Sequence, residues 1–248
     1  MTESFRNDLI LNANKINLEL NDLMIEQLYK FYIMLVEKNK VMNLTAITEE
    51  HDVIVKHFID SMCIYNMELE GNRINNSFLK DKFLIDVGTG AGFPGLVLKI
   101  LFPDLNIVLS DSLKKRLNFI EDVIKELKLD KIELVHGRAE DLAHDPKFRE
   151  KFDFSTSRAV ANLSTLTEYD LPFVKLNGYF IAYKSGKIEE ELNQAEKAIK
   201  ILGGKVENQI HFVLTDDISE RSIIFIRKIK NTGKNYPRKA GTPSKSPL

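Results

Sequence analysis

Residues 83–95 carry the feature that most restricts the fold of this chain. An apolar run, Phe83–Ile85, leads into Asp86, and glycines then stand at every second position before Pro94. Alternating glycines let the backbone turn sharply and let a ligand approach it, because no Cβ stands in the way. Pro94 suits the first turn of a helix, where its missing N–H costs nothing. The segment therefore predicts a strand, a tight loop that faces a ligand, and a helix.

The loop fits two cofactor-binding patterns. Gly90, Gly92 and Gly95 match the G-x-G-x-x-G of dinucleotide-binding enzymes. Asp86 followed by Gly88, Gly90 and Gly92 matches the acidic, glycine-rich loop of S-adenosylmethionine (SAM) methyltransferases. A carboxylate at this position would repel a pyrophosphate, whereas it could accept hydrogen bonds from loop amides or face the ammonium group of SAM. The acidic residue favours SAM, with a purely loop-organising role as the alternative.

The apolar spacing changes along the chain. From about residue 5 to 70 it follows a helical rhythm, with one run over about 49–67, and the turn-forming residues 71–77 are the best candidate for a boundary. Seven β-branched or aromatic runs then alternate with helical stretches, which indicates βαβ units and a mostly parallel sheet. Only a short turn at 215–220 separates the last two runs, so these must pair antiparallel. The predicted strands are Phe83–Val87, Ile107–Ser110, Ile132–Val135, Phe152–Ser155, Tyr179–Tyr183, Asn208–Leu214 and Ile223–Ile229, and the helices between them are Gly95–Leu101, Lys114–Leu127, Leu163–Leu176 and Glu189–Leu202.

Seven strands that end in an antiparallel pair are typical of the class I SAM-dependent methyltransferase fold, whereas a dehydrogenase domain normally stops at six parallel strands. We therefore predict an α/β, Rossmann-like fold with a seven-stranded, mostly parallel sheet and an N-terminal helical extension. The expected parts are an N-terminal helical cap (1–75), a SAM-binding methyltransferase domain (76–231) and a basic C-terminal tail (232–248).

Composition narrows the choice of partners. The net charge of −1 gives the whole molecule no attraction to nucleic acid or anionic membrane, so such binding must come from local patches. No apolar window is long enough to span a membrane, and the N-terminus does not resemble a signal peptide. The single cysteine, Cys63, excludes an internal disulfide and suits a reducing compartment. We expect a cytoplasmic monomer with no membrane partner and no bound metal.

The ends of the second and third predicted strands add two candidate contacts for an adenosine group. Asp111 lies about twenty residues past the glycines, where an acid bonds the ribose of either cofactor; a helix N-cap role is equally open. Ala139 and Glu140 follow the third strand, where methyltransferases recognise adenine through an acid and an amide. A solvated charge cluster is the alternative for the residues around Glu140.

The end of the fourth strand limits the reaction type. It carries Ser155–Val160, without the acidic, double-proline and aromatic pattern of enzymes that methylate exocyclic amines. Methylation of a pyrimidine C5 needs a cysteine nucleophile, and Cys63 lies in the helical part as a small buried hydrophobe. The remaining substrates have an atom that is already nucleophilic, such as a purine ring nitrogen, and need positioning more than acid–base help.

Basic residues gather in three places. Residues 227–248 hold seven Lys or Arg and no acid, and their Pro and Gly content suggests an extended tail or one that orders on binding. Lys114–Arg116 and Lys184–Lys187 add further cations, with Lys184 at a strand end on the cofactor side. Together they favour a polyanionic substrate, with a solubilising tail and solvated helix faces as the alternatives.

Motifs spread over nearly the whole chain resemble the RsmG (GidB) family of bacterial methyltransferases. The resemblance implies methylation of N7 of a guanine in the decoding region of 16S ribosomal RNA, in the small subunit or an assembly intermediate of it. The motifs are Asn39–Ile47, His57–Ser61, Asp86–Gly95, Asp111–Arg116, Arg138–Glu140, Ser157–Ala161 and Tyr236–Pro243. One departure is Lys184-Ser185-Gly186, where the family often has Lys-Gly.

The resemblance also implies roles for individual residues. Gly88 and Phe93 would line the SAM site, Ala139 and Glu140 would contact adenine, and Arg158 would complete the pocket. Residues expected at the RNA or the reactive face are Asn43, His57, Lys184, Arg238 and Lys239, of which Asn43 and His57, with Arg158, are the catalytic candidates. The rival functions are a nucleotide-dependent oxidoreductase and a non-catalytic RNA-binding assembly factor.

Overall fold

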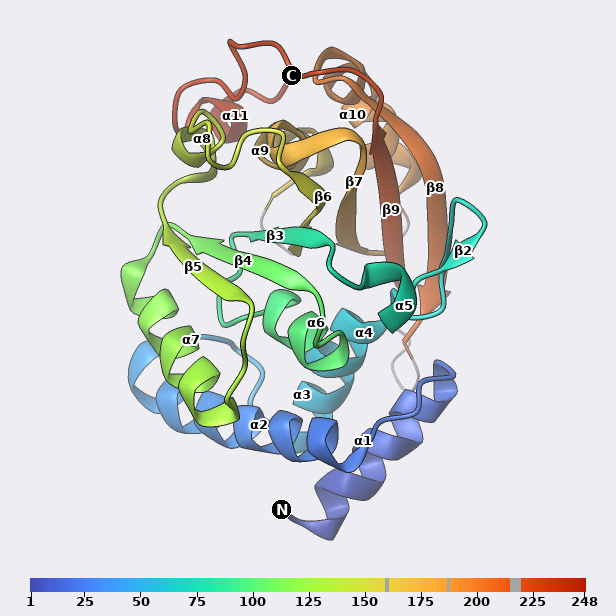
Figure 1. Cartoon of the computed structure of the whole chain (residues 1–248), viewed down its shortest axis with the longest axis vertical. Helices are drawn as coiled ribbons and strands as arrows, with labels where there is room; N and C mark the ends of the chain where they lie inside the picture. Colours follow the sequence, from blue (N-terminus) through green and yellow to red (C-terminus); the bar gives the residue numbers. More distant parts are fainter. Residues whose placement is uncertain (159–160, 187, 215–219) are drawn as a thin grey trace.

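A seven-stranded sheet forms the centre of the molecule. The computed structural model describes residues 1–158, 161–186, 188–214 and 220–248 (Figure 1). The strand order is β5-β4-β3-β6-β7-β9-β8, and β9 runs antiparallel to both of its neighbours, whereas the other adjacent pairs are parallel. The predicted class I methyltransferase sheet is therefore confirmed. The strands are β3 (Phe83–Val87), β4 (Asn106–Asp111), β5 (Ile132–His136), β6 (Phe152–Arg158), β7 (Val174–Ser185), β8 (Gly204–Val213) and β9 (Glu220–Lys228).

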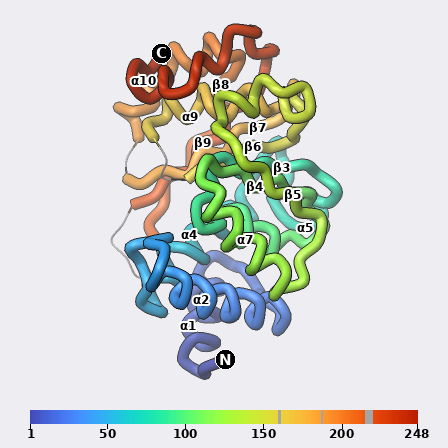
Figure 2. The backbone as a smooth tube through the Cα atoms, turned by 90° about the vertical axis from the view of Figure 1, so that its left-hand side faces the viewer, coloured from blue at the N-terminus to red at the C-terminus, as the bar shows by residue number. Residues whose placement is uncertain are grey.

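Helices cover both faces of the sheet. The N-terminal helices lie on one side together with α6 and α7, and α8 to α11 lie on the other side with the C-terminus (Figures 1 and 2). The first layer contains α1 (Glu3–Lys15), α2 (Asp22–Met42), α3 (Glu50–Val53), a π-helical segment (Ile54–Ile59), α4 (Asp60–Met62), α6 (Gly95–Leu101) and α7 (Lys114–Leu127). The second contains α8 (Ala139–Leu142), α9 (Leu163–Asp170), α10 (Glu189–Ile201) and α11 (Thr242–Lys245).

Two predicted helices are shorter than their apolar spacing indicated. The run over 49–67 ends at Met62 and contains the π-helical segment. The run over 163–176 is helical only to Asp170, passes through a 3-10 turn at Leu171–Phe173, and enters β7 at Val174. Pro172 lies in that turn, and a proline inside an α-helix removes a backbone donor and clashes with the preceding turn.

The predicted boundary at 71–77 overlaps a small hairpin, β1 (Glu68–Leu69) and β2 (Asn72–Arg73), and the start of α5 (Asn76–Leu79). Hydrophobic side chains before and after it belong to one continuous core, which joins Phe5 and Phe31 to Leu84 and Leu96. The cap and the sheet therefore bury their apolar faces against each other.

Residues 232–248 are packed against the fold, so the prediction of an extended tail, or one that orders only on binding, is wrong. Arg149 donates to the carbonyl oxygens of Thr232 and Tyr236, both at 2.9 Å, and α11 lies against α9. Arg149 thus fixes backbone carbonyls of the tail, and the composition of the tail alone does not predict this contact. No helix among the described residues is both long and apolar enough to cross a membrane.

Candidate active site

Asp86 organises the turn from β3 into α6. Its side chain is fully buried, and Oδ2 accepts hydrogen bonds from the Thr89 hydroxyl at 2.7 Å and from the Gly95 amide at 2.9 Å. The loop-organising role is therefore present in the structure. Burial raises the pKa of this carboxyl to about 6.

Glycine is required at several positions of the loop. Gly88, Gly90 and Gly92 have φ of 74°, 62° and 101°, a region that residues with a Cβ rarely adopt. A Cβ on Gly95 would lie 2.3 Å from Leu109 Cδ2 and 2.6 Å from Asp86 Oδ2, so α6 approaches β4 more closely than alanine allows.

The amides of the loop are bonded inside the protein. Gly88 and Thr89 both donate to the Ser110 carbonyl, and Gly90 donates to Asp111 Oδ2 at 3.0 Å. Gly92 and Phe93 donate to the Thr89 carbonyl. A pyrophosphate on a dinucleotide loop needs such amides free and directed at the anion. This arrangement argues against the oxidoreductase interpretation.

The carboxyl ends of β3, β4 and β5 border a cavity of about 160 Å³. Four predicted cofactor residues line it, namely Gly88, Asp111, Ala139 and Glu140. Asp111 is nearly buried, and besides the Gly90 amide it accepts the Leu113 amide at 2.8 Å, so it also shapes the entry to α7. The structure thus brings together residues from three strand ends that the sequence placed separately.

Asp170 lines the same cavity and was not found from the sequence. Its side chain is fully buried at the end of α9, and burial raises its pKa well above the usual range. The Ser155 and Ser157 hydroxyls of β6 interact with its carboxylate and oppose this rise in part, while Asp86 Oδ1 has no hydrogen-bond partner among the described residues. Sequence reasoning missed Asp170 because it fell inside a predicted helix whose polar positions are normally solvated.

The buried acids at the cavity provide a test of the cofactor. A buried carboxylate without a partner is costly, and a cationic ligand removes that cost. SAM carries a sulfonium and an ammonium group, whereas the centre of a dinucleotide cofactor is anionic. The acids that line the cavity, Asp111, Glu140 and Asp170, therefore fit the cationic SAM better than a dinucleotide.

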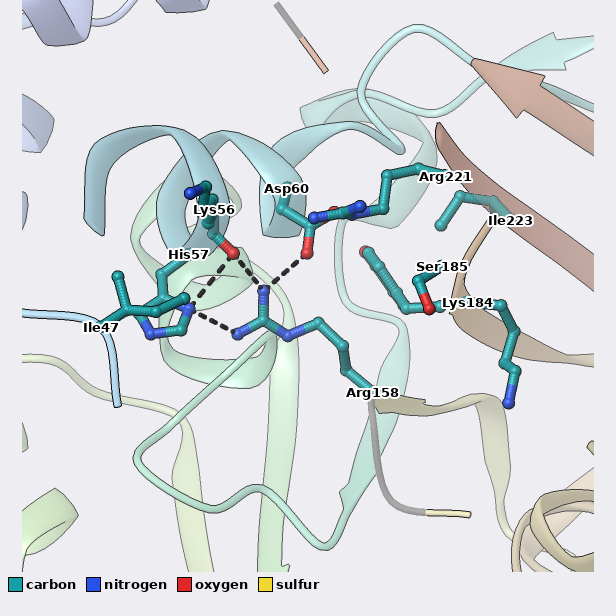
Figure 3. Close-up of a pocket in the computed structure, with 10 residues that line it drawn as sticks. Ile47, Lys56, His57, Asp60, Arg158, Lys184, Ser185, Arg221 and Ile223 are labelled. Atoms are coloured by element: carbon teal, nitrogen blue, oxygen red, sulfur yellow. Dashed lines mark hydrogen bonds and ion pairs between the residues drawn. The ribbon is translucent and has the colours of Figure 1, made fainter. Parts of the chain in front are cut away.

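A second cavity, of about 270 Å³, lies where β6, β7 and β9 meet the N-terminal helices (Figure 3). Arg158 NH1 donates to Asp60 Oδ2 at 2.8 Å and to the Lys56 carbonyl at 3.1 Å, while NH2 donates to His57 Nδ1 at 3.2 Å. The guanidinium also lies 5.1 Å from the centre of the Phe93 ring. Arg158 therefore connects the glycine-rich loop with the helical cap.

His57 is held as a neutral ring. It stacks on Phe93 with ring centres 4.4 Å apart, and Nε2 lies 2.9 Å from the Thr45 hydroxyl. Burial and the Arg158 charge lower its pKa to about 3. A neutral imidazole that accepts from Arg158 at Nδ1 and donates to Thr45 at Nε2 satisfies these two neighbours, while the Lys56 carbonyl, 3.2 Å from Nδ1, accepts from Arg158 NH1.

Comparison with known proteins decides the family. A family model described as "rRNA small subunit methyltransferase G" (GidB) matches residues 24–230. The chain belongs to this family. The Ribosomal RNA small subunit methyltransferase G of Alkaliphilus oremlandii is 50% identical over 237 residues, 95% of each chain. That of Lachnoclostridium phytofermentans is 49% identical over 239 residues, 96% of each chain.

The fold likeness to solved structures extends beyond the GidB family. The TYW2 protein of M. jannaschii, solved in complex with AdoMet, aligns with a TM-score of 0.50 at 13% identity. The alignment covers 63% of this chain and 72% of that one. At this identity the likeness concerns the fold alone, and the predicted methyltransferase fold agrees with it.

Arg221 is a further residue of the second cavity that the GidB motifs did not point to. Its Nε donates to Asp60 Oδ1 at 3.2 Å, so one carboxylate links arginines from β6 and β9. The sequence held no signal for this pairing, because Asp60 and Arg221 are 161 residues apart and meet only in the folded chain.

The remaining predicted residues lie in three environments. Lys184 lines the second cavity and forms an ion pair with Glu191 at 2.7 Å. Asn43 is exposed at the C-cap of α2, and Lys239 is exposed in the tail. Arg238 pairs with Glu168. Residues 159 and 160 of the motif Ser157–Ala161 and residue 187 of the basic segment Lys184–Lys187 lie outside the described residues. Most of the turn predicted at 215–220 lies outside them as well.

Cys63 is unsuited to nucleophilic catalysis. It is buried, its Sγ donates to the Asp60 carbonyl at 2.9 Å, and burial raises the pKa of the thiol well above its usual value. A nucleophilic cysteine needs an accessible thiolate. This geometry agrees with the interpretation of Cys63 as a structural residue.

Proposed function

We propose that this chain transfers the methyl group of SAM to N7 of a guanine in 16S ribosomal RNA. Membership of the family supports ribosomal RNA of the small subunit as the substrate. The single structural observation that carries the proposal is the set of three acids, Asp111, Glu140 and Asp170, that line the cofactor cavity while the loop amides are bonded internally. Such a site favours a cationic cofactor.

The cofactor site is assigned to the predicted residues together with Asp170. Asp111 would hold the ribose, Ala139 and Glu140 the adenine, and Gly88 with the rest of the glycine-rich loop the methionine part. Their common border on one cavity supports this assignment. SAM supplies an electrophilic methyl group at its sulfonium. Gly90, Gly92, Phe93 and Arg158 would shape the wall between this cavity and the second one.

The chemistry of the second cavity suits a ring nitrogen. Guanine N7 has its own lone pair, so methylation forms the N–C bond as the S–C bond breaks and no proton has to leave. His57 is neutral and Cys63 is buried, so neither a charged acid nor a thiolate is offered to the substrate. Arg158 and His57 would then orient the base, and positioning is the main contribution such a reaction needs.

The RNA backbone would meet the cations around that cavity. Four basic residues line it, Lys56, Arg158, Lys184 and Arg221, against one lining acid, Asp60, while Asp52 and Glu191 pair with the two lysines from outside the lining. The remaining positive charge suits phosphates. Exposed Asn43 and Lys239 would extend the contact, and Arg238 was assigned to it by the resemblance. We further propose that the protein acts as a monomer in the cytoplasm, on the small subunit or an assembly intermediate of it. The ribosomal substrate of the family supports this location and substrate.

A substituted RNA tests the position of methylation. A 16S fragment or reconstituted subunit is prepared with guanine or with 7-deazaguanine at the target, and transfer of labelled methyl from SAM is measured. We expect transfer to the guanine RNA and none to the 7-deaza RNA, which lacks the accepting lone pair. Equal labelling of both RNAs would overturn the N7 assignment. No labelling of either would favour the non-catalytic assembly factor.

A further inference from the structure

The C-terminal residues 236–248 fold back over the layer that contains α8 and α9 (Figure 1). Arg238 meets Glu168 of α9 in a paired contact, with Nε to Oε1 at 2.9 Å and NH2 to Oε2 at 2.7 Å. The Arg238 amide also donates to Oε1 at 2.7 Å. Three donors of one residue are thus directed at one carboxylate.

Within the described part of the chain, the ion pair that neutralises Glu168 comes from the tail. Its side chain is 1% exposed, and the ion pair to it comes from Arg238. A planar guanidinium matches a carboxylate with two parallel hydrogen bonds, a geometry that lysine cannot reproduce. Arg238 is therefore committed to α9, and its charge is compensated within the chain.

The same segment contacts the cofactor cavity itself. The Gly241 amide donates to Glu140 Oε1 at 2.8 Å, and Glu140 lines the cavity where adenine recognition was assigned. The Thr165 hydroxyl of α9 donates to the Pro243 carbonyl at 3.0 Å. Tyr169 and Asp170, farther along α9, also line the cavity. The tail thus touches both walls, α8 and α9.

We propose that residues 236–248 are a structural part of the SAM site, and that Arg238 is a positioning residue for SAM rather than a ligand of RNA phosphates. This inference rests on the proposed function, and it assigns the contacts of the tail with α8 and α9 to cofactor binding. The tail fixes one oxygen of Glu140 and holds α9 against the cavity. Loss of the Arg238–Glu168 pair therefore weakens the side of the cavity assigned to adenine and leaves the residues assigned to RNA binding unchanged.

The test compares Arg238→Gln and Arg238→Lys with Lys239→Gln in the full chain. SAM affinity is measured by calorimetry, and methyl transfer is measured with SAM and RNA varied separately. We expect both Arg238 variants to bind SAM about tenfold more weakly, because a tenfold change corresponds to the free energy of about one hydrogen bond to a charged group. Their KM for SAM should rise while kcat at saturating SAM and KM for RNA stay unchanged. Lys239→Gln is the matched control, an exposed cation one residue away, and should leave SAM affinity unchanged.

A phosphate ligand would behave in the opposite way. Arg238→Lys would then retain RNA binding, since lysine also binds phosphate, and both Arg238 variants would bind SAM like the wild type; that result overturns the inference. Because Arg238→Gln leaves Glu168 buried and unpaired, the double variant Glu168→Gln/Arg238→Gln is included. It removes the charge, its folding is checked by circular dichroism, and its SAM affinity is expected to be reduced as well. Wild-type chain that binds SAM but methylates no RNA would refute the proposed function and leave this inference standing.

Discussion

At the residue scale, Asp86 serves two roles with different requirements. It accepts the Thr89 hydroxyl and the Gly95 amide, which fixes the loop, and it keeps a second oxygen without a partner among the described residues. Full burial disfavours its charge and outweighs the opposing effects of its two donors and of Arg158, so its pKa rises to about 6.

This raised pKa has a consequence for stability. The folded chain keeps a proton that the unfolded chain loses, so stability falls as pH rises from 3.8 to about 6, by roughly 3 kcal/mol in all. Asp86→Asn retains an acceptor oxygen and removes the titration. Urea unfolding at several pH values should show the variant gaining on the wild type as pH rises through that window. Parallel curves for the two proteins would contradict the buried-carboxylate account.

His57 predicts the opposite trend. Its pKa falls from 6.5 to about 3 on folding, so the unfolded chain binds a proton first and stability is lost as pH falls below about 6.5. His57→Gln removes that titration. The free energy of unfolding of the wild type relative to this variant should therefore decrease on acidification. A constant difference from about pH 7 down to 4 would show that His57 is not buried in its neutral form.

At the element scale, the alternation of strands and helices was predictable because each element repeats its apolar period over several residues. All seven strands and the helix over 95–101 were located in this way. The end of α9 was not, since the apolar run over 163–176 continues past Pro172 into β7. The cavity residue Asp170 lies inside α9, and it was missed because its burial depends on the packing of α9 against β6, which leaves no local pattern.

The close approach of α6 to β4 gives a prediction for Gly95. Gly95→Ala would place a Cβ 2.3 Å from Leu109 Cδ2, and overpacking of this kind costs about 1–3 kcal/mol. The Asp86 side chain, 2.6 Å from the new atom, would be displaced as well, so SAM affinity should fall. Gly233→Ala is the matched control, because its nearest neighbour would be 3.7 Å away. Equal stability and SAM affinity in both variants would argue against this packing.

At the scale of the whole molecule, the fold and the cofactor class could be predicted from the loop, the sheet and the family motifs. The position of the tail could not. Its composition resembled a flexible basic segment, and its contacts depend on Glu168 and Glu140, which are about 70 and 101 residues away in the chain. Arg221 and Asp60 are a second example, since a pair of charges that meets across the fold leaves no local pattern.

Ligand-dependent stability separates the two cofactor classes for the whole chain. A ligand that binds only the folded state at a hundred times its dissociation constant raises the free energy of unfolding by about 2.7 kcal/mol. SAM should therefore raise the melting temperature, and NAD should leave it unchanged because the loop amides are bonded internally. A shift with NAD and none with SAM would contradict the assignment of the cavity.

The most direct test of the account is transfer of a labelled methyl group from SAM to 16S RNA, presented as naked RNA, as an assembly intermediate and as the small subunit, with the modified nucleotide then mapped. The account predicts label on at least one of these substrates, located at N7 of a single guanine, and a much lower rate with Asp170→Asn at low SAM. Label on an exocyclic amine or on a pyrimidine, or no label on any of the three, would contradict it.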